Sequence, residues 1–155
     1  MMVRHSAAVF AIATLLAVPR AASASLGADV SSIDADRIRM QGALLRISRA
    51  EAFTIHEVQS GTGTAIREYV SSSGTVFAVA WTGPWQPDLR QLLGAYFDRF
   101  QQASAAARRA RRGRGPLTID DGELTVQIVG HPRSFNGVAV VKRLTPAGVR
   151  ADRIR

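Results

Sequence analysis

The spacing of apolar residues changes between residues 53 and 129, and these changes constrain the fold more than any other feature of the sequence. Residues 53–59, 64–71 and 75–82 are rich in β-branched and aromatic residues, and the intervening segments have the composition of turns. This pattern predicts three strands joined as a meander. The third strand is apolar on both faces, which is typical of a central strand covered on both sides.

Strict alternation along this third strand predicts which side chains share a face. The two predicted sets are Phe77, Val79 and Trp81 on one face, and Val76, Ala78 and Ala80 on the other. Trp81 is therefore expected in the core.

After the third strand the apolar residues follow a helical period. In PDLRQLLGAYFDRF they recur at i, i+3, i+4, i+7, i+8 and i+11, which is one stripe of an amphipathic helix. Pro87 suits the first helical position, and Asp88 in the first turn favours the helix dipole. The residues of the stripe are Leu89, Leu92, Leu93, Tyr96, Phe97 and Phe100.

The chain then returns to strand patterns. Residues 117–120 and 123–129 flank an Asp-Gly turn and predict a hairpin, and residues 138–144 predict another strand. The order, roughly βββ-α-βββ, predicts an α+β fold: a small antiparallel sheet of about five to six strands with one long amphipathic helix on a face. Residues 25–50 lack a clean period, and they are expected to hold a short helix or a first strand.

The N-terminus predicts export. Arg4 and His5 precede a short apolar run, and the A-x-A site Ala22-Ser23-Ala24 follows, as in a secretory signal peptide. We expect residues 1–24 to be cleaved after Ala24, leaving a variable segment at 25–50 and a single domain at 51–155 in the periplasm or outside the cell. The mature chain has no second apolar run of the roughly 20 residues that span a bilayer.

The formal net charge is +8 and the sequence contains no cysteine. The absence of cysteine excludes disulfides, thiol catalysis and cysteine metal ligands, so packing alone must hold an exported chain together. A basic linker at residues 108–116 is either a solvated connection or a surface for lipopolysaccharide or another acidic polymer. Because export is expected, we do not expect nucleic acid as a partner. The candidate anion-binding residues are Arg108, Arg109, Arg111, Arg112 and Arg114.

Few residues are candidates for catalysis. The sequence has no G-x-S-x-G, H-E-x-x-H, G-x-G-x-x-G or Walker motif. His56 and His131 could meet across the sheet, with Glu57 or Glu68 nearby, as an acid–base pair or metal ligands. The favoured interpretation is that both histidines are ordinary hydrogen-bonded residues, and no metal or cofactor is expected.

The segment GHPRSFNG, residues 130–137, is a candidate binding loop. Arg133 could hold an anionic or sugar-like ligand that stacks on Phe135, and the alternative is a turn in which Arg133 pairs with a carboxylate. Trp85 follows the third strand between two prolines. It either caps the helix stripe or stays exposed as a contact platform, and the pattern favours a role in the architecture.

Several segments together resemble a family of exported proteobacterial proteins, domain of unknown function 2844. The resemblance implies export and a single compact domain, and it implies no activity, cofactor or site residue. The segments that carry it include HEV, REYVSSSGTVFAVAWTGPWQPDLRQLLGAYF, DGELTVQ, GHPRSFNGVA and LTPAGV.

The leading hypothesis is a non-catalytic periplasmic or secreted module that binds an envelope protein or an anionic envelope polymer. One alternative is a small hydrolase or lyase in which His131 acts with Arg133, assisted by His56 or Glu68. A second alternative is an anionic-surface binder that uses the basic linker.

Overall fold

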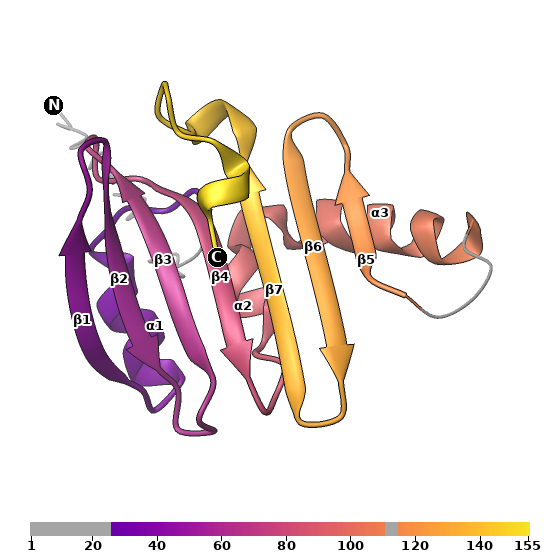
Figure 1. Ribbon diagram of the computed structural model, residues 1–155, viewed down its shortest axis with the longest axis horizontal. Helices are drawn as coiled ribbons and strands as arrows, with labels where there is room; N and C mark the ends of the chain where they lie inside the picture. The colour runs from indigo at the N-terminus through magenta and orange to yellow at the C-terminus, as the bar shows by residue number, and fades with distance from the viewer. Residues whose placement is uncertain (1–25, 111–114) are drawn as a thin grey trace, which may run out of the picture.

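The computed structural model describes residues 26–110 and 115–155, and in these residues seven antiparallel strands form one sheet (Figure 1). The strand order across the sheet is β1-β2-β3-β4-β7-β6-β5. The α+β prediction is confirmed, with one strand more than the sequence indicated. The strands are β1 (Ala43–Arg49), β2 (Phe53–Gln59), β3 (Ala65–Ser71), β4 (Val76–Gly83), β5 (Leu117–Asp120), β6 (Leu124–His131) and β7 (Ser134–Val141).

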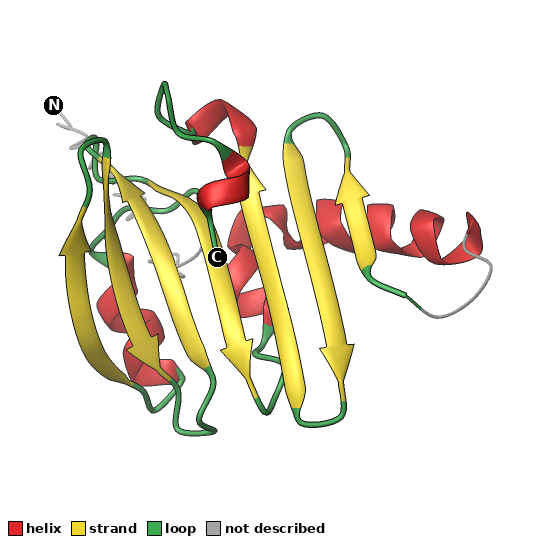
Figure 2. Cartoon of the chain, viewed as in Figure 1, coloured by secondary structure: helices red, strands yellow, loops and turns green. Residues whose placement is uncertain are grey.

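The α-helices cover one face of this sheet, and the C-terminal segment lies over part of the other (Figure 2). Among the helices of the described residues, none is both long and apolar enough to cross a membrane. The helical elements are α1 (Ser32–Arg39), α2 (Leu89–Leu93), η1 (Gly94–Tyr96), α3 (Phe97–Ala110), η2 (Lys142–Leu144) and η3 (Ala151–Arg153).

The long helix predicted between β4 and β5 is present as three consecutive pieces, α2, η1 and α3. Gly94 interrupts it with a φ of 48°, a left-handed value that glycine adopts readily. Asp88, predicted in the first turn, is instead the N-cap residue: its carboxylate accepts hydrogen bonds from the backbone N–H groups of Arg90 and Gln91.

Residues 26–50 join the same sheet. The sequence indicated either a short helix or a first strand there, and the structure contains both, α1 and β1. β1 is an edge strand with most of its residues exposed, including Leu44, Leu45 and Ile47. An edge strand with so little burial carries a weak alternation signal, which explains why the sequence did not define it.

The prediction of the two faces of β4 is wrong in part. Tyr69 on β3 pairs with Ala78 and Val70 pairs with Val76, so Phe77 is an extra residue, a β-bulge. The bulge shifts the alternation: Val76 lies with Val79 and Trp81 under the helices, and Phe77 lies with Ala78 and Ala80 on the opposite face. β4 is buried on both faces, as predicted, because the C-terminal segment covers the second cluster.

Trp81 lies in the core, as expected, with 2% of its surface exposed. It is paired with Gly137 of β7, and a Cβ atom at residue 137 would lie 2.1 Å from the Cζ2 atom of the indole. The indole therefore occupies the space that any other residue at 137 would need.

We expect Gly137→Ala to lower the free energy of unfolding by about 1–3 kcal/mol, because the added methyl group forces Trp81 out of its position. Urea denaturation followed by circular dichroism measures this change. Val129→Ala, at an exposed position of the neighbouring strand β6, serves as the control and should change stability by less than about 0.5 kcal/mol. Equal stability of Gly137→Ala and wild type would contradict the described packing.

Candidate functional site

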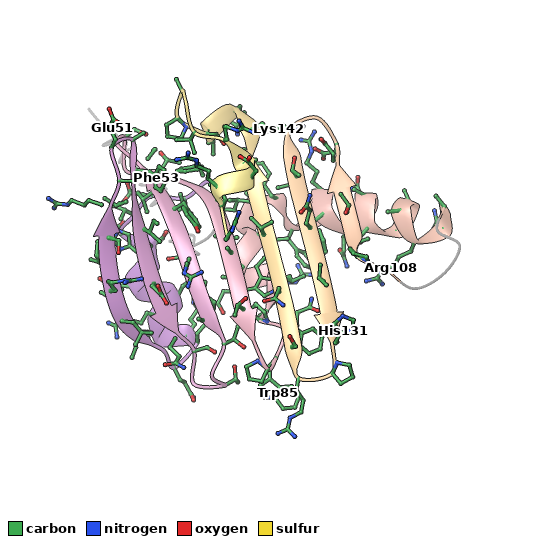
Figure 3. All side chains as sticks on the ribbon, in the orientation of Figure 1. Glu51, Phe53, Trp85, Arg108, His131 and Lys142 are labelled. Carbon is green, nitrogen blue, oxygen red and sulfur yellow. The ribbon has the colours of Figure 1, made fainter. Side chains whose placement is uncertain are left out.

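Four residues proposed from the sequence lie at one end of the sheet. β4 ends at Gly83, which pairs with Phe135 of β7, and Trp85 follows two residues later. His131 and Arg133 lie at the adjoining turn between β6 and β7. Figure 3 shows Trp85 and His131 at this same end. We call the surface formed by Trp85, His131, Arg133 and Phe135 the tryptophan end.

Trp85 is 60% exposed, so the expectation that it serves mainly the architecture is wrong. Its backbone is nevertheless anchored, because the Thr64 hydroxyl donates a 2.7 Å hydrogen bond to the Trp85 carbonyl oxygen. Gly83 allows this contact: a Cβ atom there would lie 2.5 Å from the Cα atom of Thr64. The loop thus fixes the backbone of Trp85 while leaving most of the side chain in solvent.

The predicted loop GHPRSFNG is a tight hairpin turn rather than a long loop. His131 pairs with Ser134, so only Pro132 and Arg133 connect the strands. Proline followed by a residue with φ of 65° is the pattern of a type II turn, whose third position favours glycine or asparagine. Arg133 is exposed and makes no ion pair within residues 26–110 and 115–155, in contrast to the alternative that tied it to a carboxylate.

Phe135 is half-buried and packs over the strand beside it. A Cβ atom at Gly130 would lie 2.9 Å from the Phe135 ring, so this glycine makes room for the aromatic side chain. The ring therefore lies against Gly130 of β6 and is only partly available for stacking. Trp85 therefore offers the larger exposed aromatic surface at the tryptophan end.

His56 and Glu68 lie elsewhere. They face each other across β2 and β3, on the side of the sheet that the helices cover. Between their strands and β6, which carries His131, lie β4 and β7. The structure therefore does not bring the two histidines together, and the described residues contain no group of three histidine, aspartate or glutamate side chains able to hold a metal ion.

Glu68 belongs to a buried pair of carboxyl groups whose second member, Asp36 of α1, the sequence did not reveal. Both side chains have no exposed surface. Among the described residues, neither Glu68 oxygen has a hydrogen-bond partner, and Asp36 Oδ1 accepts a 2.8 Å hydrogen bond from Gln91 Nε2. No signal in the sequence could have found Asp36, because its burial depends on how α1 packs against the sheet.

Burial shifts the titration of this cluster. It raises the pKa of Glu68 from 4.5 to about 8, with a further contribution from the charge of Asp36, and raises the pKa of Asp36 from 3.8 to about 6. Burial also lowers the pKa of His56. At neutral pH Glu68 is mostly a neutral acid inside the core.

The basic linker is described only in part. Arg108 and Arg109 lie exposed in the last turn of α3, where positive charge complements the helix dipole. The other three candidates, Arg111, Arg112 and Arg114, lie outside the described residues.

We expect the free energy of unfolding to fall as pH rises from about 4.5 to about 8, since the folded pKa of Glu68 lies above its ordinary value. The folded state binds more protons than the unfolded state in this window, so each rise in pH favours unfolding. Glu68→Gln, which cannot ionise, should be more stable than wild type by roughly 1–3 kcal/mol above about pH 8 and similar to it near pH 5.

Urea denaturation at several pH values measures this effect, with Glu51→Gln, at an exposed position, as the control that keeps the wild-type profile. Parallel pH profiles of wild type and Glu68→Gln would contradict the burial of an ionisable group at position 68.

A comparison with known protein families finds a match over most of the chain. The family described as "Protein of unknown function (DUF2844)" matches residues 22–154. Comparison with curated proteins and with solved structures finds no match. Since the family match includes α1 and all seven strands, the chain belongs to the DUF2844 family.

Proposed function

We propose that this chain is an exported, non-catalytic binding module and that the tryptophan end is its contact surface. The observation that carries the proposal is the 60% exposed indole of Trp85 on an anchored backbone. Tryptophan is enriched among residues that dominate binding energy, because a large rigid side chain contributes area at little entropic cost. An indole with most of its surface in solvent contributes less to folding than a buried one.

The turn beside Trp85 supports the same proposal. Arg133 occupies a left-handed conformation that costs an arginine roughly 1 kcal/mol relative to glycine, while its guanidinium points to no carboxylate in the described residues. A strained, exposed and unpaired arginine at a hairpin tip contributes nothing to packing. It is well placed to contact an acidic or polar group of a ligand.

The proposal of export rests on the sequence. The basic start, short apolar run and A-x-A site of residues 1–24 are those of a signal peptide, and these residues lie outside the described part of the chain. The alternative of a hydrolase or lyase is less well supported, because His56 and Glu68 cannot assist a reaction at His131.

The first experiment places a photo-crosslinking residue at Trp85 or His131 in the full chain expressed in its own cells. We expect a discrete adduct from both positions, in the envelope or culture-medium fraction. Glu51 lies at the opposite end of the sheet (Figure 3) and is the control position, from which this adduct should be absent. Identical products from all three positions, or none from Trp85 and His131 in a folded chain, would count against the proposal.

A second experiment separates the strain at Arg133 from its function. We expect Arg133→Asn to raise the free energy of unfolding by about 0.5–1 kcal/mol, because asparagine tolerates a positive φ, and to lower the adduct yield from position 85. Arg153→Asn, an exposed substitution in η3, is the control and should change neither quantity. A more stable Arg133→Asn with an unchanged adduct yield would remove Arg133 from the contact surface.

A further inference from the structure

We propose that a pocket beside Trp85 binds an uncharged sugar unit of a glycan. This inference rests on the proposed binding function and names the chemistry of the ligand. The pocket has a volume of about 390 Å³, which is within the range of small-molecule sites. Trp85 and Gln91 line it on the side of β4 and α2, Arg39 lines it at the end of α1, and Ser60 and Thr62 line it from the β2–β3 turn.

The charged groups of the pocket are already engaged within the protein. The guanidinium of Arg39 lies 3.7 Å from the carboxylate of Asp36. The carboxylate of Asp88 accepts hydrogen bonds of 2.8 and 3.3 Å from the backbone of α2. Because one cation and one anion line the pocket and both have partners, the site favours a ligand without net charge.

The remaining polar groups suit a ligand with hydroxyl groups. Gln91 Nε2 donates a hydrogen bond to Asp36 Oδ1, which fixes the orientation of the amide; its side-chain carbonyl oxygen is an acceptor. The hydroxyl groups of Ser60 and Thr62 lie 2.8 Å apart, and each can donate or accept. Hydroxyls and amides in this arrangement match the combined donors and acceptors of a sugar.

Trp85 provides the apolar surface that a pyranose ring also needs. One face of such a ring presents C–H groups, which pack against the face of an indole. The 60% exposure of Trp85 leaves that surface accessible next to the hydroxyl and amide groups. An apolar wall beside a small number of oriented polar groups is typical of small-ligand sites.

The pocket walls are held in place before any ligand binds. The backbone N–H of Gly61 donates a 3.0 Å hydrogen bond to the Met40 carbonyl oxygen, so the turn after α1 and the β2–β3 turn are joined. Thr64 links the β2–β3 turn to the β4–α2 connection that carries Trp85. Its N–H donates to Ser60 Oγ, and its hydroxyl donates to the Trp85 carbonyl oxygen. A preformed site loses little conformational entropy on binding.

The test is isothermal titration calorimetry of the full chain with cellohexaose, maltohexaose and chitohexaose, and with polygalacturonate as an anionic polymer. We expect saturable binding of at least one neutral hexasaccharide that is unchanged by added salt. Intrinsic fluorescence gives a second readout: Trp81 is buried and Trp85 is exposed, so binding should shift the Trp85 emission to shorter wavelength.

Trp85→Ala should weaken binding of the neutral sugar at least about tenfold, and Trp85→Phe, which keeps an aromatic face, should retain part of it. Arg153→Asn should leave it unchanged, because Arg153 lies in η3 and does not line the pocket. Absence of binding of all three neutral sugars at about 5 mM overturns the inference.

The outcomes also separate this inference from the proposed function. An adduct from position 85 in cells without neutral sugar binding overturns the sugar pocket and leaves the binding module in place. Binding of polygalacturonate alone, lost in Arg133→Asn and at high salt, overturns the neutral ligand and assigns an acidic polymer to the tryptophan end.

Discussion

The antiparallel pairing of β4 with β7 is the interaction on which the rest of the structure depends. It joins the meander of β1 to β4 with the three C-terminal strands, although the helical connection separates them in sequence. Trp81 lies against Gly137 at this seam, where no other side chain fits. The same register pairs Gly83 with Phe135, which brings the loop of Trp85 beside the β6–β7 turn.

The sequence predicted the elements whose signals are local. Alternation and turn composition identified the meander and the hairpin, and the helical stripe identified the segment that covers the sheet. The faces of β4 were predicted incorrectly, because a bulge at Phe77 depends on the register with β3 and leaves no mark in the composition. The helix α1 was ambiguous since few of its side chains are apolar, and its packing depends on the buried Asp36 as well as Ile33.

The sequence identified each candidate binding residue separately, but it did not predict how these residues are arranged in space. Trp85, His131, Arg133 and Phe135 stood out as aromatic and cationic residues among prolines and glycines, and the sheet places all four at one end. The sequence assigned Trp85 mainly to the architecture, since nothing local shows that its indole faces solvent. The pocket could not be predicted, because its walls come from three connections that meet only in the folded chain.

The residues that lower the stability of this fold lie in two places, the exposed tryptophan end and the buried pair of carboxyl groups. Gln91 contacts the buried pair and lines the pocket beside Trp85. Trp85 and Arg133 depart from the rules of packing and backbone conformation at one exposed end, as is expected of residues kept for contact rather than stability. Asp36 and Glu68 impose their cost inside the core, without reaching a ligand. Gln91 lines the pocket and donates to Asp36, and this hydrogen bond strengthens when the carboxyl group ionises. This hydrogen bond therefore offsets part of the free-energy cost of burying Asp36, and it also orients Gln91 in the wall of the pocket.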